Sequence, residues 1–265
     1  MIFTFSGTGN SFHVARMVSD AMGIPKIDLA AAVRFKRFVY DANGEDVGFV
    51  FPVYYLGLPD MVRRFAEKVE VRHAGKVFCI ITCAGTSGGA YEQLREKLGK
   101  RLDVSVCYDV LMPENAVFYE DVPTREEAAP ILAAADEEVR NIIGSLKAGD
   151  TGDLRKRPDA ASAAEWYPRY DEDRRTENFR INERCIECRI CEDVCPEQII
   201  KIYHRKPVWD EELCSMCMCC LNLCPKKAIE FGPDTAGRGR YYHPDFYERV
   251  IGIPLKWRLP PLIAL

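Results

Sequence analysis

Two stretches near the C-terminus of this 265-residue chain repeat each other cysteine for cysteine. Both have the spacing Cys-x2-Cys-x2-Cys-x3-Cys-Pro, and the offset between the copies is the same at all four cysteines. The first run contains Cys185, Cys188, Cys191 and Cys195, and the second contains Cys214, Cys217, Cys220 and Cys224. This spacing allows three thiolates of one tight loop to bind a 4Fe–4S cluster. The duplicated run therefore predicts two such clusters.

We expect crossed ligation, because the fourth cysteine of such a run is carried away by the helix that it opens and binds the partner cluster. One cluster would take Cys185, Cys188, Cys191 and Cys224, and the other would take Cys214, Cys217, Cys220 and Cys195. Disulfides and zinc are the alternatives. The chain opens without a signal-like basic region, which disfavours disulfides, and zinc ribbons use two separate Cys-x2-Cys pairs.

The segment that holds both runs, residues 178–231, resembles a bacterial-type two-cluster ferredoxin module. Such clusters are degraded by oxygen when they are exposed. We therefore expect a reduced, anaerobic cytoplasm as the setting of this protein.

The composition is that of a globular protein, since 48% of the residues are hydrophobic. The 36 basic and 40 acidic residues give a net charge of −4, which does not favour nucleic acid as a partner. No apolar run approaches the ~20 residues of a transmembrane helix, so we expect no membrane span.

Apolar runs alternate with amphipathic stretches over residues 1–148. The stretches that predict strands are residues 2–5, 47–53, 77–82 and 104–111, and those that predict helices are residues 11–22, 58–69, 90–98 and 124–146. Residues 47–53 are almost wholly apolar, as expected of a strand that a parallel sheet buries on both faces. This alternation predicts an α/β domain with a doubly wound parallel sheet.

Residues 149–177 lose the apolar periodicity and gain Gly, Asp and Arg, so the sequence predicts a linker there. We therefore expect an α/β domain at 1–148, a small α+β cluster domain at 178–231 and a tail at 232–265. The tail ends in Ile263, Ala264 and Leu265, and this apolar end is expected to dock on the protein.

Three loops follow the carboxyl ends of successive predicted strands, where open α/β sheets bind their ligands. The first loop contains Ser6, Gly7, Thr8, Gly9, Asn10 and Ser11. The second contains Pro52, Val53, Tyr54, Tyr55, Leu56 and Gly57. The third contains Thr82, Cys83, Ala84, Gly85, Thr86, Ser87, Gly88 and Gly89.

Each loop offers groups that suit one part of a phosphorylated aromatic ligand. Hydroxyls, backbone N–H groups and a helix start in the first loop suit a phosphate. Adjacent tyrosines in the second loop can present a flat face to a ring, and small residues in the third allow a close approach to a ring edge. The first loop is neither a P-loop nor a dinucleotide fingerprint, because Phe12 replaces the third glycine and no Lys-Ser/Thr pair follows.

This trio of loops resembles the cofactor site of flavodoxins. By that resemblance, the first loop would hold the phosphate of FMN, Tyr54 or Tyr55 would pack on the isoalloxazine, and the third loop would contact the pyrimidine edge. The third loop lacks a second aromatic residue, so we expect the segment that includes Asn115, the linker or the cluster domain to cover the inner face. The alternative is that Tyr54 and Tyr55 are core aromatics near a turn.

Taken whole, the chain resembles the ferredoxin–flavodoxin fusion proteins of anaerobic bacteria and archaea. The resemblance implies electron transfer between two 4Fe–4S clusters and FMN, with redox proteins such as a ferredoxin, a reductase or an oxidase as partners. Two rival functions stay open. One is a flavin-dependent reductase of a quinone or an activated alkene, with Tyr54, Tyr55 and His13 as its only candidate proton donors. The other is a redox-sensing or docking subunit of a larger complex.

Overall fold

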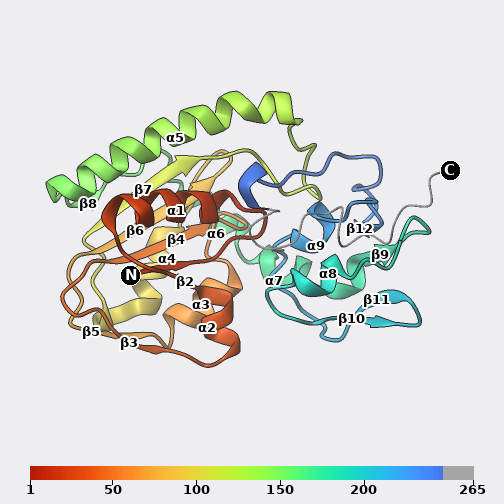
Figure 1. Ribbon diagram of the computed structural model, residues 1–265, viewed down its shortest axis with the longest axis horizontal. Coiled ribbons are helices and arrows are strands. Elements are labelled where there is room, and N and C mark those ends of the chain that lie inside the picture. The colour runs from red at the N-terminus through yellow and green to blue at the C-terminus, as the bar shows by residue number, and fades with distance from the viewer. Residues whose placement is uncertain (247–265) are drawn as a thin grey trace. The chain divides into compact units, whose positions relative to one another are not determined.

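The computed structural model describes residues 1–246, which form two compact units (Figure 1). Unit 1 consists of Met1–Ser6, Asn10–Pro113 and Glu126–Asp173. Unit 2 consists of Gly7–Gly9, Glu114–Arg125 and the described residues from Arg174 onward. The predicted docking segment at the end of the tail lies outside the described residues.

Unit 1 is built on a six-stranded, wholly parallel sheet with the order β2-β1-β4-β6-β7-β8. These strands are β1 (Ile2–Thr4), β2 (Lys26–Asp28), β4 (Val47–Pro52), β6 (Val77–Cys83), β7 (Val106–Leu111) and β8 (Gly152–Asp153). Two short strands, β3 (Val39–Asp41) and β5 (Glu70–Arg72), form a separate parallel pair. The central strands are mostly apolar because both of their faces are covered, and every residue of β6 is buried.

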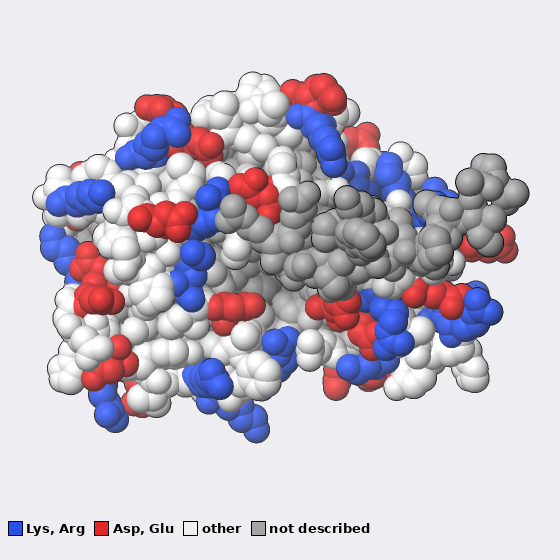
Figure 2. Space-filling view, viewed as in Figure 1, with Lys and Arg blue, Asp and Glu red and all other residues white. Residues whose placement is uncertain are grey.

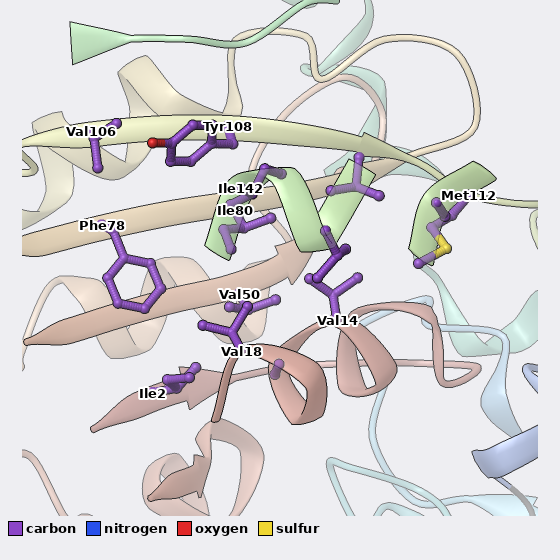
Figure 3. Packing of buried hydrophobic residues seen from close by; sticks show 14 of the residues in the cluster. Ile2, Val14, Val18, Val50, Phe78, Ile80, Val106, Tyr108, Met112 and Ile142 are labelled. Carbon is purple, nitrogen blue, oxygen red and sulfur yellow. The ribbon is translucent and has the colours of Figure 1, made fainter. Parts of the chain in front are cut away.

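The helices of this part are α1 (Asn10–Met22), α2 (Leu29–Arg34), α3 (Asp60–Ala66), α4 (Ala90–Leu98), the 3-10 turn η1 (Gly99–Arg101) and α5 (Arg125–Ala148). Alternate residues of a strand point to opposite faces, and β1 shows the consequence. Ile2 belongs to the core cluster that α1 and α5 contribute to (Figure 3), whereas the ring of Phe3 lies 4.8 Å from that of Phe65 on α3. Helices therefore pack on both faces of the sheet, and the predicted α/β class is confirmed.

The segment at 149–177, for which the sequence predicts a linker, carries regular structure. It contains β8, α6 (Ala160–Trp166), α7 (Arg169–Asp173) and the 3-10 turn η2 (Thr176–Asn178). Asp159 begins α6 and accepts a hydrogen bond from the Ser162 N–H at 3.1 Å, which caps the helix. Tyr170 on α7 is 2% exposed, so an aromatic side chain of this segment is part of a core.

Unit 2 contains two antiparallel strand pairs and two one-turn helices. Its elements are β9 (Phe179–Ile181), which pairs with β12 (Ile229–Phe231), β10 (Ile200–Tyr203), which pairs with β11 (Lys206–Trp209), and the helices α8 (Ile190–Asp193) and α9 (Cys219–Asn222). The rings of Phe179 and Trp209 stack at 4.6 Å and join the two strand pairs.

The cysteine repeat in the sequence is also a repeat of backbone conformation. Left-handed residues occur at matching places in the two runs, and they are Glu187 and Met216, Arg189 and Met218, and Gln198 and Lys227. The second left-handed residue of each run, Arg189 or Met218, is the N-cap of a one-turn helix, α8 or α9. The loops therefore have the same tight conformation although their side chains differ.

Within the described residues, no helix has the length and apolar character needed to cross a membrane. On the face shown in Figure 2, basic and acidic side chains are interspersed, in keeping with the nearly balanced net charge.

Candidate metal and cofactor sites

Three cysteines of the first run lie close to the last cysteine of the second. Burial raises the pKa of the Cys191 thiol to about 12, and the charges of Cys188, Cys224 and Cys185 add to the rise. The pKa of Cys188 is raised in the same way, by burial first and then by Cys224 and Cys185. The structure therefore places Cys224 close to the cysteines of the first run.

The remaining four predicted ligands form a second group. Burial raises the pKa of the Cys214 thiol to about 12, with a further contribution from the charge of Cys195. Burial also raises the pKa of Cys220 well above its usual value, and Cys217, Cys195 and Cys214 add to that rise. Cys195, the last cysteine of the first run, thus lies among the cysteines of the second run.

Backbone N–H groups point at several of these sulfur atoms. The Met216 N–H donates to Cys214 Sγ at 3.1 Å, and the Ala228 N–H donates to Cys224 Sγ at 3.2 Å. Such N–H···S hydrogen bonds stabilise thiolates and help to set the potential of a cluster. The tight left-handed turns of the two runs allow the peptide groups to turn toward the sulfur atoms.

This donor set fits iron. Grouped, buried thiols with raised pKa values do not ionise together in water, because each negative charge opposes the next. A cationic centre removes that cost, and iron in clusters is held by cysteine thiolates. Cys219, which is 3% exposed and lies between Cys217 and Cys220, is buried too, but the run does not use its position.

The three candidate flavin loops start at strands that are neighbours in the sheet of unit 1. The chain leaves β1 for β2 on one side, and later returns to β4 on the other side of β1. The strand order therefore reverses between β1 and β4, and open α/β sheets bind ligands beside the carboxyl ends at such a point. β6 is the next strand beyond β4.

The side chains at the start of α1 are already held by protein groups. The hydroxyl of Ser11 lies 2.7 Å from that of Thr82, and the Asn10 amide donates to the Pro113 carbonyl at 3.0 Å. Thr8 groups with unit 2, and its Oγ1 accepts a hydrogen bond of 2.6 Å from the Asn115 amide. Thr8 and Asn115, which the sequence assigns to the same cofactor, are thus in direct contact.

The second loop is a tight turn whose tyrosines pack on the segment after β8. Tyr55 and Leu56 both have positive φ, +48° and +59°. The ring of Tyr55 stacks on Tyr170 with centroids 5.5 Å apart, and its hydroxyl donates to Asp173 at 3.0 Å. Burial raises the pKa of Tyr55, and the bond to Asp173 adds to the rise, so the phenol keeps its proton. Tyr54 makes edge contacts with Phe5 and Tyr170.

The third loop is held at its base by hydrogen bonds to Arg157 and Asp109. Thr86 Oγ1 donates to the Arg157 carbonyl at 2.7 Å, and Ser87 Oγ donates to the Asp109 carboxylate at 3.0 Å. Gly88 has φ +55° and leaves no space for a Cβ, which would collide with the Leu56 carbonyl. Ala84 and Gly85 are the exposed residues of this loop. These contacts leave the tip of the loop open while its base is locked to the second loop.

Residues that the motifs did not reveal are central to these contacts. They are Asp109, Arg157 and Tyr170 in unit 1 and Asn222 and His243 in unit 2. Two of these residues carried a signal in the sequence. Tyr170 is one of three aromatic residues in the predicted linker, with Trp166 and Tyr167, which suggest that part of it packs, and Asp109 is a single carboxylate within the apolar strand β7. A charge in such a strand is rarely fully buried without partners.

Residues 184–242 match the family model of the 4Fe-4S dicluster domain. The match contains both cysteine runs and extends past the predicted end of the cluster domain into the tail. It shows that this part of the chain is a 4Fe–4S ferredoxin-type domain, which supports iron–sulfur electron transfer. A search of curated protein sequences gave no match to the chain.

Proposed function

We propose that this chain is an electron-transfer flavoprotein that carries two 4Fe–4S clusters and one FMN. The grouping of the eight motif cysteines carries the cluster part of the proposal. Cys224 lies among the first set and Cys195 among the second, as crossed ligation by a duplicated run requires. The matching backbone conformations of the two runs further support two sites of the same kind.

The strand order of unit 1 supports FMN. Numbered along the chain, the first five strands of its sheet have the order 2-1-3-4-5, which is that of flavodoxins, and those proteins bind FMN where the strand order reverses. In this proposal, the first loop holds the phosphate, the tyrosine turn flanks the ring and the open tip of the third loop meets the ring edge.

The two kinds of cofactor have complementary capacities. A cluster carries single electrons, whereas a flavin carries one or two. A chain with both connects one-electron carriers to two-electron chemistry. The protein residues would supply N–H···S hydrogen bonds, exclude water from the thiolates and hold the flavin by its phosphate. Other redox proteins would be the partners.

Rapid mixing with a one-electron reductant tests this function. We expect the cluster absorbance to bleach first and the flavin to be reduced afterwards, at a rate that follows the bleaching. A matched variant with Cys188→Ala and Cys217→Ala should keep its FMN but lose this delayed phase. Equal rates of flavin reduction in the two proteins would contradict the proposed electron path.

The structure gives less support to the reductase alternative, because two of its three nominated proton donors, Tyr55 and His13, are engaged. The Tyr55 hydroxyl donates to Asp173, and His13 Nε2 lies 2.7 Å from an Asp136 carboxylate oxygen. Electron transfer between proteins needs no such donor, so it stays the function that we propose.

A further inference from the structure

The hydroxyl group of Thr8 is oriented by a neighbouring amide. The Asn115 side chain donates to Thr8 Oγ1 at 2.6 Å, so this oxygen is the acceptor in the contact. Thr8 is 1% exposed, and within residues 1–246 its hydroxyl proton has no acceptor. A buried hydroxyl in this state is prepared to donate to an incoming anion.

Asn222, at the end of α9, holds Asn115 in turn. Its side-chain amide donates to the Asn115 carbonyl at 3.1 Å and to the Met218 carbonyl at 3.1 Å. Its Oδ1 accepts a hydrogen bond of 3.0 Å from the Tyr241 N–H. The Asn222 side chain is 1% exposed, and both ends of its amide have partners. Its orientation is therefore determined by hydrogen bonds on all sides.

The contacts close into a ring that returns to Thr8. Two residues after Tyr241, the His243 N–H donates to the Thr8 carbonyl at 2.8 Å. The next residue of the loop, Gly9, has φ +105°, and a Cβ there would collide with Phe246. The backbone and the side chain of Thr8 are thus both held by hydrogen bonds. Asn222 contacts Asn115, which holds the side chain, and Tyr241, which precedes the His243 that holds the backbone.

We propose that Asn222 is a positioning residue for the phosphate of the flavin. It acts through Asn115, which keeps the Thr8 hydroxyl proton directed at a phosphate oxygen. This inference rests on the proposed function, since it presumes that FMN is the ligand. It assigns part of the phosphate site to a helix that carries a cluster cysteine, Cys220.

The decisive measurement is the ratio of the affinities for FMN and riboflavin, which differ only by the phosphate. The full chain with assembled clusters is stripped of flavin and titrated with each compound by fluorescence quenching. In Asn222→Leu, which has a similar size but no hydrogen-bonding groups, FMN affinity should fall about tenfold or more while riboflavin affinity stays unchanged. Asn182→Ala is the matched control, because Asn182 also donates to a backbone carbonyl of unit 2, at Lys227, but makes no contact with this ring.

A double-mutant cycle separates positioning from general support. If Asn222 acts through the Thr8 hydroxyl, Asn222→Leu should have no further effect on FMN affinity in a Thr8→Val background. Equal losses of FMN and riboflavin affinity in Asn222→Leu would overturn the inference. So would a double variant in which the losses of FMN affinity caused by Asn222→Leu and Thr8→Val are simply additive. Should Asn222→Leu fail to assemble its clusters, Asn115→Leu removes the same orienting amide, keeps the carbonyl that Asn222 contacts, and must show the same ratio change.

The unmodified protein tests the proposed function separately. Absence of FMN binding there would reject the flavin itself, and the inference with it. Normal FMN binding together with an unchanged ratio in both the Asn222 and the Asn115 variants would reject the inference alone.

Discussion

The carboxylate of Asp109 accepts a hydrogen bond of 3.0 Å from the hydroxyl of Ser87 and thereby joins strand β7 to the third candidate flavin loop. The same carboxylate accepts hydrogen bonds from the Lys156 and Arg157 N–H groups and from the Arg157 guanidinium. It has no exposed surface, so all of its charge is compensated by these donors. This single side chain therefore organises the loop and the segment behind it.

Replacing Asp109 by Asn should destabilise unit 1 by about 2–4 kcal/mol. The change removes the fully buried counter-charge of the Arg157 guanidinium and replaces one acceptor oxygen by an NH2 group, which turns a donor toward N–H donors. Urea unfolding followed by far-UV circular dichroism measures the loss. Asp103→Asn is the control, since Asp103 is exposed and its replacement should stay within about 0.5 kcal/mol of the unmodified protein. Similar stabilities of the two variants would contradict the role given to Asp109.

Iron and acid-labile sulfide should each amount to about eight atoms per chain, because each cubane holds four of each. Chemical analysis of anaerobically reconstituted protein provides this number. Values near four in fully reconstituted protein would leave only one cluster and would contradict the proposal of two.

Replacing Cys195 by Ala should damage the cluster that the second run holds. Crossed ligation makes a clear pattern in double variants. Adding Cys214→Ala to Cys195→Ala should cause little further loss of iron, because both cysteines bind the same cluster. Adding Cys185→Ala to Cys195→Ala should remove the remaining half of the iron, because Cys185 binds the other cluster. Iron analysis and electron paramagnetic resonance of the reduced proteins report both outcomes. The reverse pattern would mean that each run holds its own four-cysteine cluster. Cys219→Ala serves as the control and should retain all of its iron.

Thr8→Val should weaken FMN binding by roughly 1–3 kcal/mol, because it removes a hydroxyl donor to the phosphate. The clusters should be unaffected, as judged by their visible absorbance. Thr151→Val, at an exposed threonine, should retain the affinity of the unmodified protein. Unchanged flavin retention in Thr8→Val would place the phosphate elsewhere, and recovery of FAD instead of FMN would reject the flavodoxin resemblance.

Tyr55→Phe should lower stability by about 0.5–1.5 kcal/mol through loss of the hydrogen bond to Asp173. The effect should depend on pH in one direction. The pKa of Tyr55 is raised by burial and by Asp173, so the folded state favours the neutral phenol. The advantage of the unmodified protein is therefore complete below the ordinary tyrosine pKa of 10.0 and shrinks as pH rises above it. Denaturant unfolding of both proteins from pH 7 to 11 measures it, and a difference that grew with pH would contradict this assignment.

The longer elements and the cysteine runs could be predicted because their signals are local. The apolar run of β4 spans only a few neighbouring residues, and so does the motif formed by Cys185, Cys188 and Cys191. Strands β2 and β8 have only three and two residues, and such short strands leave no periodicity to detect. Their pairing depends on β1 and β7, which are distant in sequence.

The supporting contacts of the candidate site could not be predicted for a related reason. Thr8 and Asn115 are separated by 107 positions, and so are Asn115 and Asn222. Asparagine is common in turns. The part that Asn115 and Asn222 play in the ring of hydrogen bonds around Thr8 becomes visible only when segments distant in sequence come together. Tyr170 likewise lies in a stretch whose composition indicates a linker, yet its ring is buried against the tyrosine turn.

The two cysteine loops share a backbone conformation but differ in polarity, and this difference would make the two proposed clusters unequal. Where the first loop has Glu187 and Arg189, the second has Met216 and Met218, which are 4% and 2% exposed. Reduction adds negative charge to a cluster, and an apolar surrounding penalises added charge. We expect the cluster beside the methionines to have the lower potential. An electron shared between them would then move energetically downhill toward the cluster of the more polar loop, which would give the duplicated module a preferred direction.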